Sequence, residues 1–286
     1  MTAQLLSGKP VAEAVFADLE PRIALLRAAG RPVGLGTVLV GNDGASEGYI
    51  RMKMDRAESL GLANPHIHLG DDATQDEVIE AIQTMNQDPT VTGLLVQHPT
   101  PPQIDFEAAL LAIDPDKDVD GLHPINMGRL ALGMAGPVPC TPAGIEALLA
   151  HYEIPVSGRN VCILGRGTTL GRPLALLLSQ KRPTANAAVT VVHTGVSDWP
   201  EYTRRSDIVV AAAGVPGILR PEHIRPGSVV VGGGVRYEGR TLMSDVDEAC
   251  AEVAGWITPR IGGVGPTTIA MLFKNCVDAA ERLAAE

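Results

Sequence analysis

Aromatic residues and cysteines are both scarce in this chain, and each shortage argues against a class of function. Aromatic residues make up 3% of the 286 residues, which argues against the stacking platforms that bind single-stranded nucleic acid. The four cysteines, Cys140, Cys162, Cys250 and Cys276, are scattered, and no C-x-x-C pair indicates a zinc or redox site. Free, buried thiols in a reducing cytoplasm fit this pattern best.

The chain also lacks long apolar segments and an excess of positive charge. No run of about 18 or more apolar residues appears, so we expect no membrane span. Lys9, Pro10 and Glu13 interrupt the N-terminal region before it reaches the apolar length of a signal peptide. The formal net charge of −10 opposes a large contact with a nucleic-acid backbone. These features predict a cytoplasmic protein that binds neither nucleic acid nor membranes.

Helical and strand patterns alternate along the first half of the chain. The chain is long enough for two domains, and this alternation predicts a mostly parallel sheet covered by helices. Thr74 and Glu77 have the spacing of a capping box. Two irregular loops follow, "HPTPPQID" and "DPDKDVDGLHP", of the kind that carries ligand groups at the ends of parallel strands. The predicted elements are helices 11–29, 45–60 and 75–86 and strands 35–41, 66–69 and 91–97.

The strand and helix pattern restarts after residues 136–144. We therefore predict an α/β fold with two domains. The predicted domains are 1–140 and 141–265, with a final helix, 266–286, that starts at Pro266 and packs back on the first domain. The other predicted elements are helix 142–152 and strands 188–193, 207–214 and 228–234.

The segment "ILGRGTTLGRP" places three glycines between a strand and a helix. Gly165, Gly167 and Gly171 allow close backbone approach, and the helix N-terminus would face a pyrophosphate. Alone, the turn would also suit a tight connection with no ligand. NAD sites usually place an acid after the next strand, but here that strand ends at His193-Thr194. Arg166 would bind a 2′-phosphate through charge-assisted bonds, so the turn favours NADP.

Several polar groups admit a simple structural interpretation. Tyr49 and Lys53 lie one helical turn apart, a spacing that is ordinary for a solvated helix face. The aspartates of "DPDKDVDG" could cap a turn or bind calcium, but the loop lacks the glycine and terminal glutamate of an EF-hand. His66 and His68 share one strand face without an obvious third ligand. We therefore predict no metal.

Taken in order, six features resemble one enzyme family over essentially the whole chain. They are Tyr49 with Lys53, "VQHPTP", "DPDKDVDGLHPINMGRL", "PCTPAG", the glycine turn and "GGVGPTTIAML". This set resembles the bifunctional methylenetetrahydrofolate dehydrogenase/methenyltetrahydrofolate cyclohydrolase family. The resemblance implies oxidation of 5,10-methylenetetrahydrofolate with NADP, then hydrolysis of the methenyl product to 10-formyltetrahydrofolate. It also implies an N-terminal α/β folate domain, an NADP-binding Rossmann domain and a cleft between them that holds the folate. The family's enzymes further imply a cytoplasmic homodimer in one-carbon metabolism, which serves purine biosynthesis.

The same resemblance implies roles for individual residues. Lys53 takes the catalytic lysine role, and Tyr49 stacks on or positions the folate rings. Gln97 hydrogen-bonds the lysine, and Asp120 holds the pterin. Hydrolysis needs proton transfers, for which an amine shielded from bulk water is suited. Further implied substrate contacts are Gly262, Gly263, Pro266 and Thr267. Implied cofactor contacts are Gly165, Arg166, Gly167, Thr168, Gly171, His193, Thr194, Gly214 and Val235.

Several positions depart from the family pattern, although the four residues assigned to chemistry are present. These departures concern the folate wall and the loop near the nicotinamide, so we expect activity with altered efficiency. Two alternatives are a specialised paralogue with one activity impaired and a catalytically silent NADP or folate binding protein; a shikimate-type dehydrogenase is more distant. Retention of Lys53 speaks against a silent protein. The departing residues are His98, Thr100, Gly167, Gly232, Arg236, Arg260 and Ile261.

Overall fold

The computed structural model describes residues 2–239 and 241–285, and their contacts divide the chain into two compact units. We name them the three-stranded unit and the six-stranded unit after the main sheet in each. Neither unit is one continuous piece of chain. The three-stranded unit comprises Val15–Arg129, Met134–Val138 and Leu272–Glu286, and the six-stranded unit comprises Met1–Ala14, Leu130–Gly133 and Pro139–Met271.

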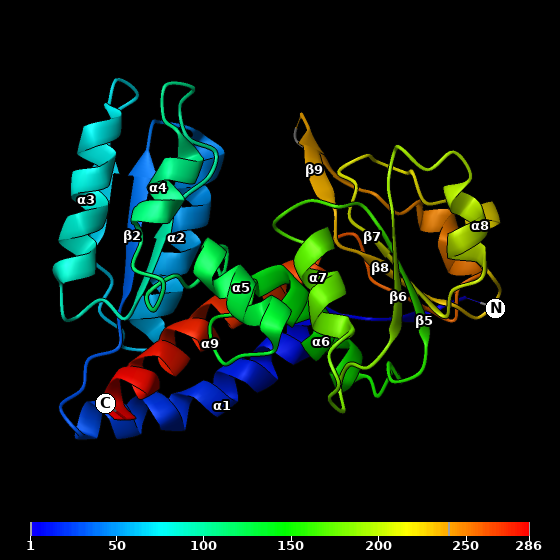
Figure 1. Ribbon diagram of the computed structural model, residues 1–286, viewed down its shortest axis with the longest axis horizontal. Helices are drawn as coiled ribbons and strands as arrows, with labels where there is room; N and C mark the ends of the chain where they lie inside the picture. Colours follow the sequence, from blue (N-terminus) through cyan, green and yellow to red (C-terminus); the bar gives the residue numbers. More distant parts are fainter. Residues whose placement is uncertain (1, 240, 286) are drawn as a thin grey trace. The chain divides into compact units, whose positions relative to one another are not determined.

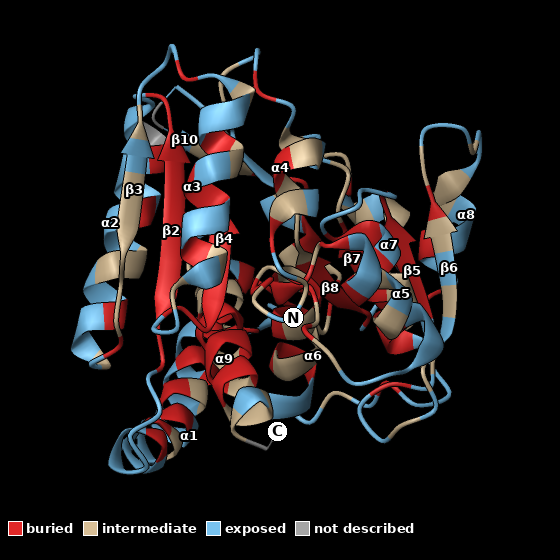
Figure 2. Ribbon diagram, turned by 60° about the vertical axis from the view of Figure 1, so that its left-hand side comes forward, coloured by how far each residue is buried: buried red, intermediate tan, exposed pale blue. Residues whose placement is uncertain are grey.

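The three-stranded unit is built on a parallel sheet whose middle strand is β2 (Figure 1) and whose strand order is β3-β2-β4 (Figure 2). Strands β2 (Leu35–Val40) and β4 (Gly93–Val96) are buried along their whole lengths (Figure 2), as expected of parallel strands covered on both faces. Helix α3 (Gln75–Gln87) packs on this sheet and begins with the predicted capping box of Thr74 and Glu77. Residues 44–132 also form α2 (Gly44–Ser59), β3 (His66–Leu69), α4 (Phe106–Ala112) and α5 (Pro124–Leu132).

The six-stranded unit holds a sheet with the order β1-β11-β8-β7-β5-β6, in which every pair is parallel. The chain passes from β5 outward to β6 and then crosses back to β7, so the winding reverses beside β5. Ligands bind at the carboxyl ends of strands at such a switch point. The strands are β1 (Gln4–Leu5), β5 (Asn160–Leu164), β6 (Ala188–Val192), β7 (Ile208–Ala211), β8 (Val229–Gly232) and β11 (Trp256–Ile257).

Helices and a hairpin complete the six-stranded unit. Its core joins Ile145 and Leu148 of α6 to Val161 and Ile163 of β5. All four cysteines are buried, and none forms a disulfide bond among the described residues. No helix of the described residues is long and apolar enough to cross a membrane. The remaining elements are α6 (Cys140–His151), α7 (Gly171–Leu178), α8 (Trp199–Arg204), β9 (Val235–Glu238), β10 (Thr241–Ser244) and two short 3-10 helices, Pro221–His223 and Glu248–Glu252.

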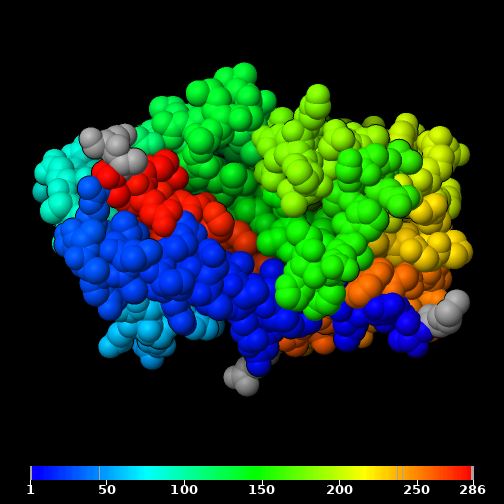
Figure 3. All heavy atoms as spheres, turned by 90° about the horizontal axis from the view of Figure 1, so that it is seen from below, coloured from blue at the N-terminus to red at the C-terminus, as the bar shows by residue number. Residues whose placement is uncertain are grey.

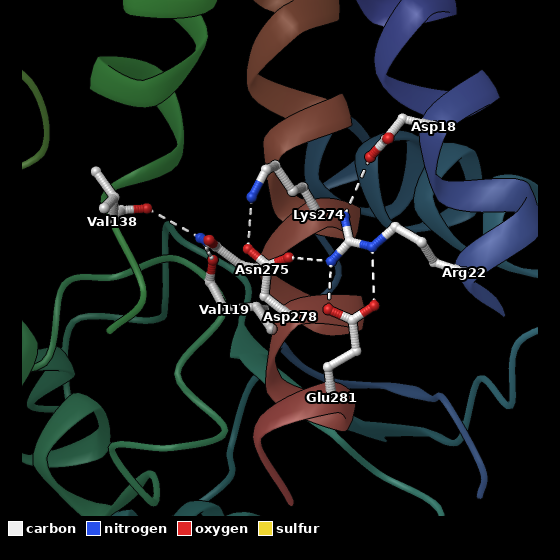
Figure 4. A network of polar contacts seen from close by, with 8 residues as sticks. All are labelled: Asp18, Arg22, Val119, Val138, Lys274, Asn275, Asp278 and Glu281. Carbon is white, nitrogen blue, oxygen red and sulfur yellow. Dashed lines mark hydrogen bonds and ion pairs between the residues drawn. The ribbon is translucent and has the colours of Figure 1, made fainter. Parts of the chain in front are cut away.

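The N-terminal helix α1 (Gly8–Ala28) and the C-terminal helix α9 (Val264–Ala285) lie side by side (Figure 3), and ion pairs join them within the three-stranded unit (Figure 4). The Arg22 guanidinium donates to both carboxylate oxygens of Glu281, at 2.8 and 2.6 Å. It also donates to Asp278, which accepts a further bond from Lys274 at 2.6 Å. Bidentate, charge-assisted bonds of this kind fix geometry as well as adding stability. They hold the two helices in one register.

Asn275 connects α9 to two loops of the same unit (Figure 4). Its side-chain amide donates to the backbone carbonyls of Val119 and Val138, at 2.8 and 2.9 Å. The residue is buried, so these bonds are shielded from competing water. Val119 directly precedes Asp120, and the last helix therefore holds the backbone that carries this candidate residue.

The structure corrects several predicted boundaries. Helices α1, α6 and α9 each begin two residues before the proline that was predicted to precede or open them, so that Pro10, Pro142 and Pro266 are the third residues. Proline is tolerated there because first-turn N–H groups have no acceptor within the helix. The elements not predicted are β1, α4, α5, α8, β9, β10, β11 and both 3-10 helices. The compact units differ from the predicted domains 1–140 and 141–265 chiefly at residues 1–14, which belong to the six-stranded unit. The predicted domains were defined by the ligand that each binds, and in that sense they stay predictions.

Candidate active site and cofactor site

Lys53 and Gln97 form a hydrogen-bonded pair in the three-stranded unit. Lys53 lies on α2, and Gln97 directly follows β4. The lysine amine donates to Gln97 Oε1 at 3.0 Å. The other end of the same amide donates to the His98 carbonyl at 2.6 Å, so the glutamine oxygen is turned toward the lysine. Both members of the pair are half-buried.

Asp120 interacts electrostatically with Lys53. Burial raises the pKa of its carboxyl above the ordinary value, the charge of Lys53 opposes that rise, and the charge of Asp118 adds to it. A titratable acid with a perturbed pKa beside a lysine is typical of an active site. The structure thus brings Lys53, Gln97 and Asp120 together.

The charged residues just before Asp120 serve the loop itself. The buried carboxylate of Asp118 accepts the backbone N–H groups of Gly121 at 3.0 Å and His123 at 2.8 Å. Lys117 donates to backbone carbonyls at the end of α3. Because these side chains bind backbone groups, they fix the loop. Asp120 is the acid of this segment that interacts with Lys53.

Tyr49 lies one turn before Lys53 on α2 and is 41% exposed. The spacing places both residues on one helix face. Among the departures of the folate wall, His98 packs edge-on against the ring of Phe106, with ring centres 4.8 Å apart, and Thr100 is half-buried. His98 is thus held against α4.

The described residues contain no group of three or more His, Cys, Asp or Glu side chains that could hold a metal ion. The two histidines of β3 have protein partners instead. His66 Nδ1 bonds to the Thr37 hydroxyl at 2.8 Å, and His68 Nε2 bonds to the Gly41 carbonyl at 2.8 Å. Both histidines therefore bond within the three-stranded unit.

The three glycines of the turn after β5 have different roles. A Cβ on Gly165 would lie 2.0 Å from the Ala212 carbonyl, and φ at this glycine is +133°. A Cβ on Gly171 would lie 2.3 Å from the Gly165 carbonyl. Both positions therefore require glycine. A Cβ on Gly167 would meet nothing within 4 Å, so that position is open and tolerates a side chain.

The surroundings of this turn fit NADP. Helix α7 begins with no side-chain cap. The Arg172 N–H donates to the Gly167 carbonyl at 3.1 Å and Pro173 has no N–H, so the Gly171 N–H is the first-turn donor left for a pyrophosphate. Arg166 and Thr168 are exposed. After β6, Thr194 is exposed and His193 Nδ1 accepts the Gly195 N–H at 3.1 Å. Arg166 is therefore available to bind a 2′-phosphate, and no acidic residue directly follows β6.

Two further candidate residues lie in neighbouring loops of the six-stranded unit. Gly214 follows β7, has φ of +68° and is exposed. Val235 begins β9 and is 49% exposed. Both loops contact the buried carboxylate of Asp245, which sequence reasoning missed. The signal was weak because its partners are backbone groups.

The loop before α9 carries the remaining substrate candidates. Gly262 has φ of +78°, and its carbonyl accepts the Gly8 N–H at 2.8 Å. A Cβ on Gly8 would lie 1.9 Å from the Gly263 carbonyl, so Gly8 is a further required residue that the sequence did not reveal. Pro266 is half-buried. Thr267 is fully buried, and its hydroxyl donates to the Val264 carbonyl at 2.7 Å, so neither its side chain nor its backbone is exposed to a substrate.

Two departures from the family pattern meet at one pocket of the six-stranded unit. A Cβ on Gly232 would lie 2.9 Å from the Ser244 hydroxyl and 3.4 Å from the Thr258 hydroxyl. Both hydroxyls line this pocket together with Arg260, which pairs with Glu248 at 3.0 Å. An added side chain at position 232 would therefore crowd the pocket.

The remaining departures lie at the surface. Arg236 pairs with Glu238 at 2.6 Å on the exposed hairpin. Ile261, next to the glycines that precede α9, is 68% exposed. Neither side chain packs in the core.

Comparison with known proteins identifies the family. Residues 6–120 match the model of the tetrahydrofolate dehydrogenase/cyclohydrolase catalytic domain, and residues 139–284 match that of the NAD(P)-binding domain. The bifunctional protein FolD 1 of Salinispora tropica is 64% identical over 280 residues, covering 98% of this chain and 92% of that protein. The bifunctional protein FolD of Syntrophotalea carbinolica is 55% identical over 284 residues, covering 99% and 98%.

A solved structure agrees with these matches. The Trypanosoma brucei methylenetetrahydrofolate dehydrogenase-cyclohydrolase, complexed with NADP cofactor and inhibitor, has a TM-score of 0.91 and 36% identity, with 100% of both chains covered. The predicted two-domain α/β fold is confirmed. Matched by both domain models and by full-length relatives at more than half of its positions, the chain belongs to the tetrahydrofolate dehydrogenase/cyclohydrolase family.

Proposed function

We propose that the chain oxidises 5,10-methylenetetrahydrofolate with NADP to the methenyl form and hydrolyses that product to 10-formyltetrahydrofolate. The full-length relatives are bifunctional by name, and both family domains are present. The T. brucei relative binds NADP, and the glycine turn fits that cofactor. No observation favours a chain with one activity impaired or a silent binding protein. The predicted cleft between the domains stays a prediction.

The six-stranded unit holds NADP and orients it. Bound NADP accepts the hydride of the dehydrogenase step. Gly165 and Gly171 keep the turn narrow, the Gly171 N–H at the start of α7 faces the pyrophosphate, and Arg166 pairs with the 2′-phosphate. In this step the protein mainly positions the two reactants.

Lys53 carries the proton transfers of the cyclohydrolase step. As the neutral amine it takes a proton from the water that adds to the methenyl carbon, and it delivers a proton to the ring nitrogen as the carbon–nitrogen bond breaks. Gln97 orients the amine through the 3.0 Å bond. Asp120 holds the pterin by accepting paired N–H groups, and Tyr49 packs on the folate rings. The Lys53–Gln97 bond is the observation that carries this proposal.

Replacing Lys53 with methionine tests the assignment. We expect hydrolysis of the methenyl substrate to fall by about 10²–10⁴, the usual contribution of a positioned acid or base, while folate affinity stays nearly unchanged. Loss of methenyl absorbance measures the rate, and calorimetry measures the affinity. Arg51→Met, an exposed residue of the same helix, is the matched control. Native hydrolysis by Lys53→Met would show that the lysine is assigned wrongly.

We also propose that the protein is a cytoplasmic homodimer, as the family resemblance implies. The four buried thiols, which form no disulfide among the described residues, suit a reducing compartment. Strand β3 is an edge of the three-stranded sheet, where another copy could pair. Light scattering after gel filtration tests the dimer, and a mass of 30 kDa would contradict it. Cell fractionation tests the compartment. Supply of one-carbon units for purine synthesis follows from 10-formyltetrahydrofolate as product.

A further inference from the structure

We infer that Asp245 is a positioning residue of the NADP site, which fixes the two loops that carry Gly214 and Val235. The inference rests on the proposed function, since it concerns the same cofactor. Asp245 follows β10 and is 1% exposed. It therefore acts through the loops and does not contact solvent.

The first loop is held by direct bonds to the carboxylate. Asp245 Oδ2 accepts the N–H groups of Ala213 at 2.7 Å and Gly214 at 2.8 Å. Successive N–H groups that converge on one anion form a small, rigid nest. The segment after β7 is thus shaped around this carboxylate at the switch point of the sheet.

The second loop is held by close packing and by the backbone. A Cβ on Gly234 would lie 2.0 Å from Asp245 Oδ2, so the carboxylate occupies the space that a side chain would need. The Asp245 N–H also donates to the Gly234 carbonyl at 3.0 Å. Gly234 directly precedes Val235. One residue therefore spaces the loop after β7 from the loop after β8.

A buried carboxylate is costly unless hydrogen bonds compensate it. Burial raises the pKa of Asp245, whereas the N–H groups of Gly214, Ala213 and Val215, and the charge of Arg236, oppose that rise. An amide of the same shape accepts fewer bonds and points N–H groups at other N–H groups. Replacement would therefore loosen the loops without removing any group that we expect to touch the ligand.

Two variants disturb the contacts of the Asp245 carboxylate in different ways. Asp245→Asn removes the acceptor, and Gly234→Ala displaces the carboxylate. We expect each to raise the KM for NADP by about tenfold or more, since losing hydrogen bonds to a charged group costs at least one factor of ten. Hydrolysis of methenyl substrate, assayed without NADP, should stay native. Asp247→Asn, which affects only a cap at Ala249, is the matched control.

The outcomes separate a positioning role from a general structural one. Trp199 and Trp256, both in the six-stranded unit, report its folding by fluorescence. Folded variants with an unchanged KM for NADP would overturn the inference. So would loss of native fluorescence in both variants, or an equal fall in both activities. If the wild type itself failed to reduce NADP, the proposed function would fail instead, and calorimetric NADP binding would still test Asp245.

Discussion

Replacing Asn275 with alanine removes the bonds that tie α9 to the backbone before Asp120. The side-chain amide donates to the carbonyls of Val119 and Val138, at 2.8 and 2.9 Å, from a buried position. A neutral hydrogen bond contributes about 0.5–1.5 kcal/mol net, so two contribute about 1–3 kcal/mol. The better helix propensity of alanine offsets about 0.5 kcal/mol of this loss. We expect a lower free energy of unfolding and a higher KM for the folate substrate, because Asp120 loses its support.

Urea unfolding followed by circular dichroism measures the stability, and the cyclohydrolase assay measures the KM. Lys274→Ala, at the adjacent position, is the control. It removes an i,i+4 ion pair with Asp278 whose lysine is 42% exposed, and such pairs contribute about 0.5 kcal/mol or less. The reasoning is refuted if Asn275→Ala is no less stable than Lys274→Ala and binds folate normally.

Two further predictions concern the candidate sites. Burial raises the pKa of the Asp120 carboxyl above 3.8 in the folded protein, so the folded state binds the carboxyl proton more tightly than the unfolded state. The free energy of unfolding of the wild type therefore falls as pH rises from 3.8 through the raised pKa. Asp120→Asn lacks this effect, so its stability relative to wild type should rise from pH 4 to neutral pH in urea titrations; a constant difference would contradict the assignment. Gly165→Ala should weaken NADP binding severely, because its Cβ would lie 2.0 Å from the Ala212 carbonyl, whereas Gly167→Ser should bind nearly normally. Calorimetry compares them, and equal affinities would refute the turn model.

Buried strands were predictable because parallel strands covered on both faces appear as continuous apolar runs. The segments that became β2, β4 and β7 have this character. Strands β1 and β11, with two residues each, are too short to show any period. The starts of three helices were misplaced because proline suits the first turn without having to open it.

The candidate site was predictable only in part, for reasons of distance and chemistry. Lys53 and Gln97 lie 44 residues apart, and no local pattern pairs them; the family resemblance did. Asp245 and Asn275 bind backbone groups, whose positions depend on the fold and leave no trace in neighbouring side chains. Gly8 is required by a carbonyl more than 250 positions away.

The pairing of β1 with β11 has a consequence for synthesis on the ribosome. Gln4 is in register with Trp256, so one edge of the larger sheet joins segments made about 250 residues apart. At 5–20 residues per second, the first segment waits roughly 12–50 s for its partner. Until then the backbone groups of this segment must hydrogen-bond to water or to a chaperone. Completion of this domain therefore waits until residue 256 has been made.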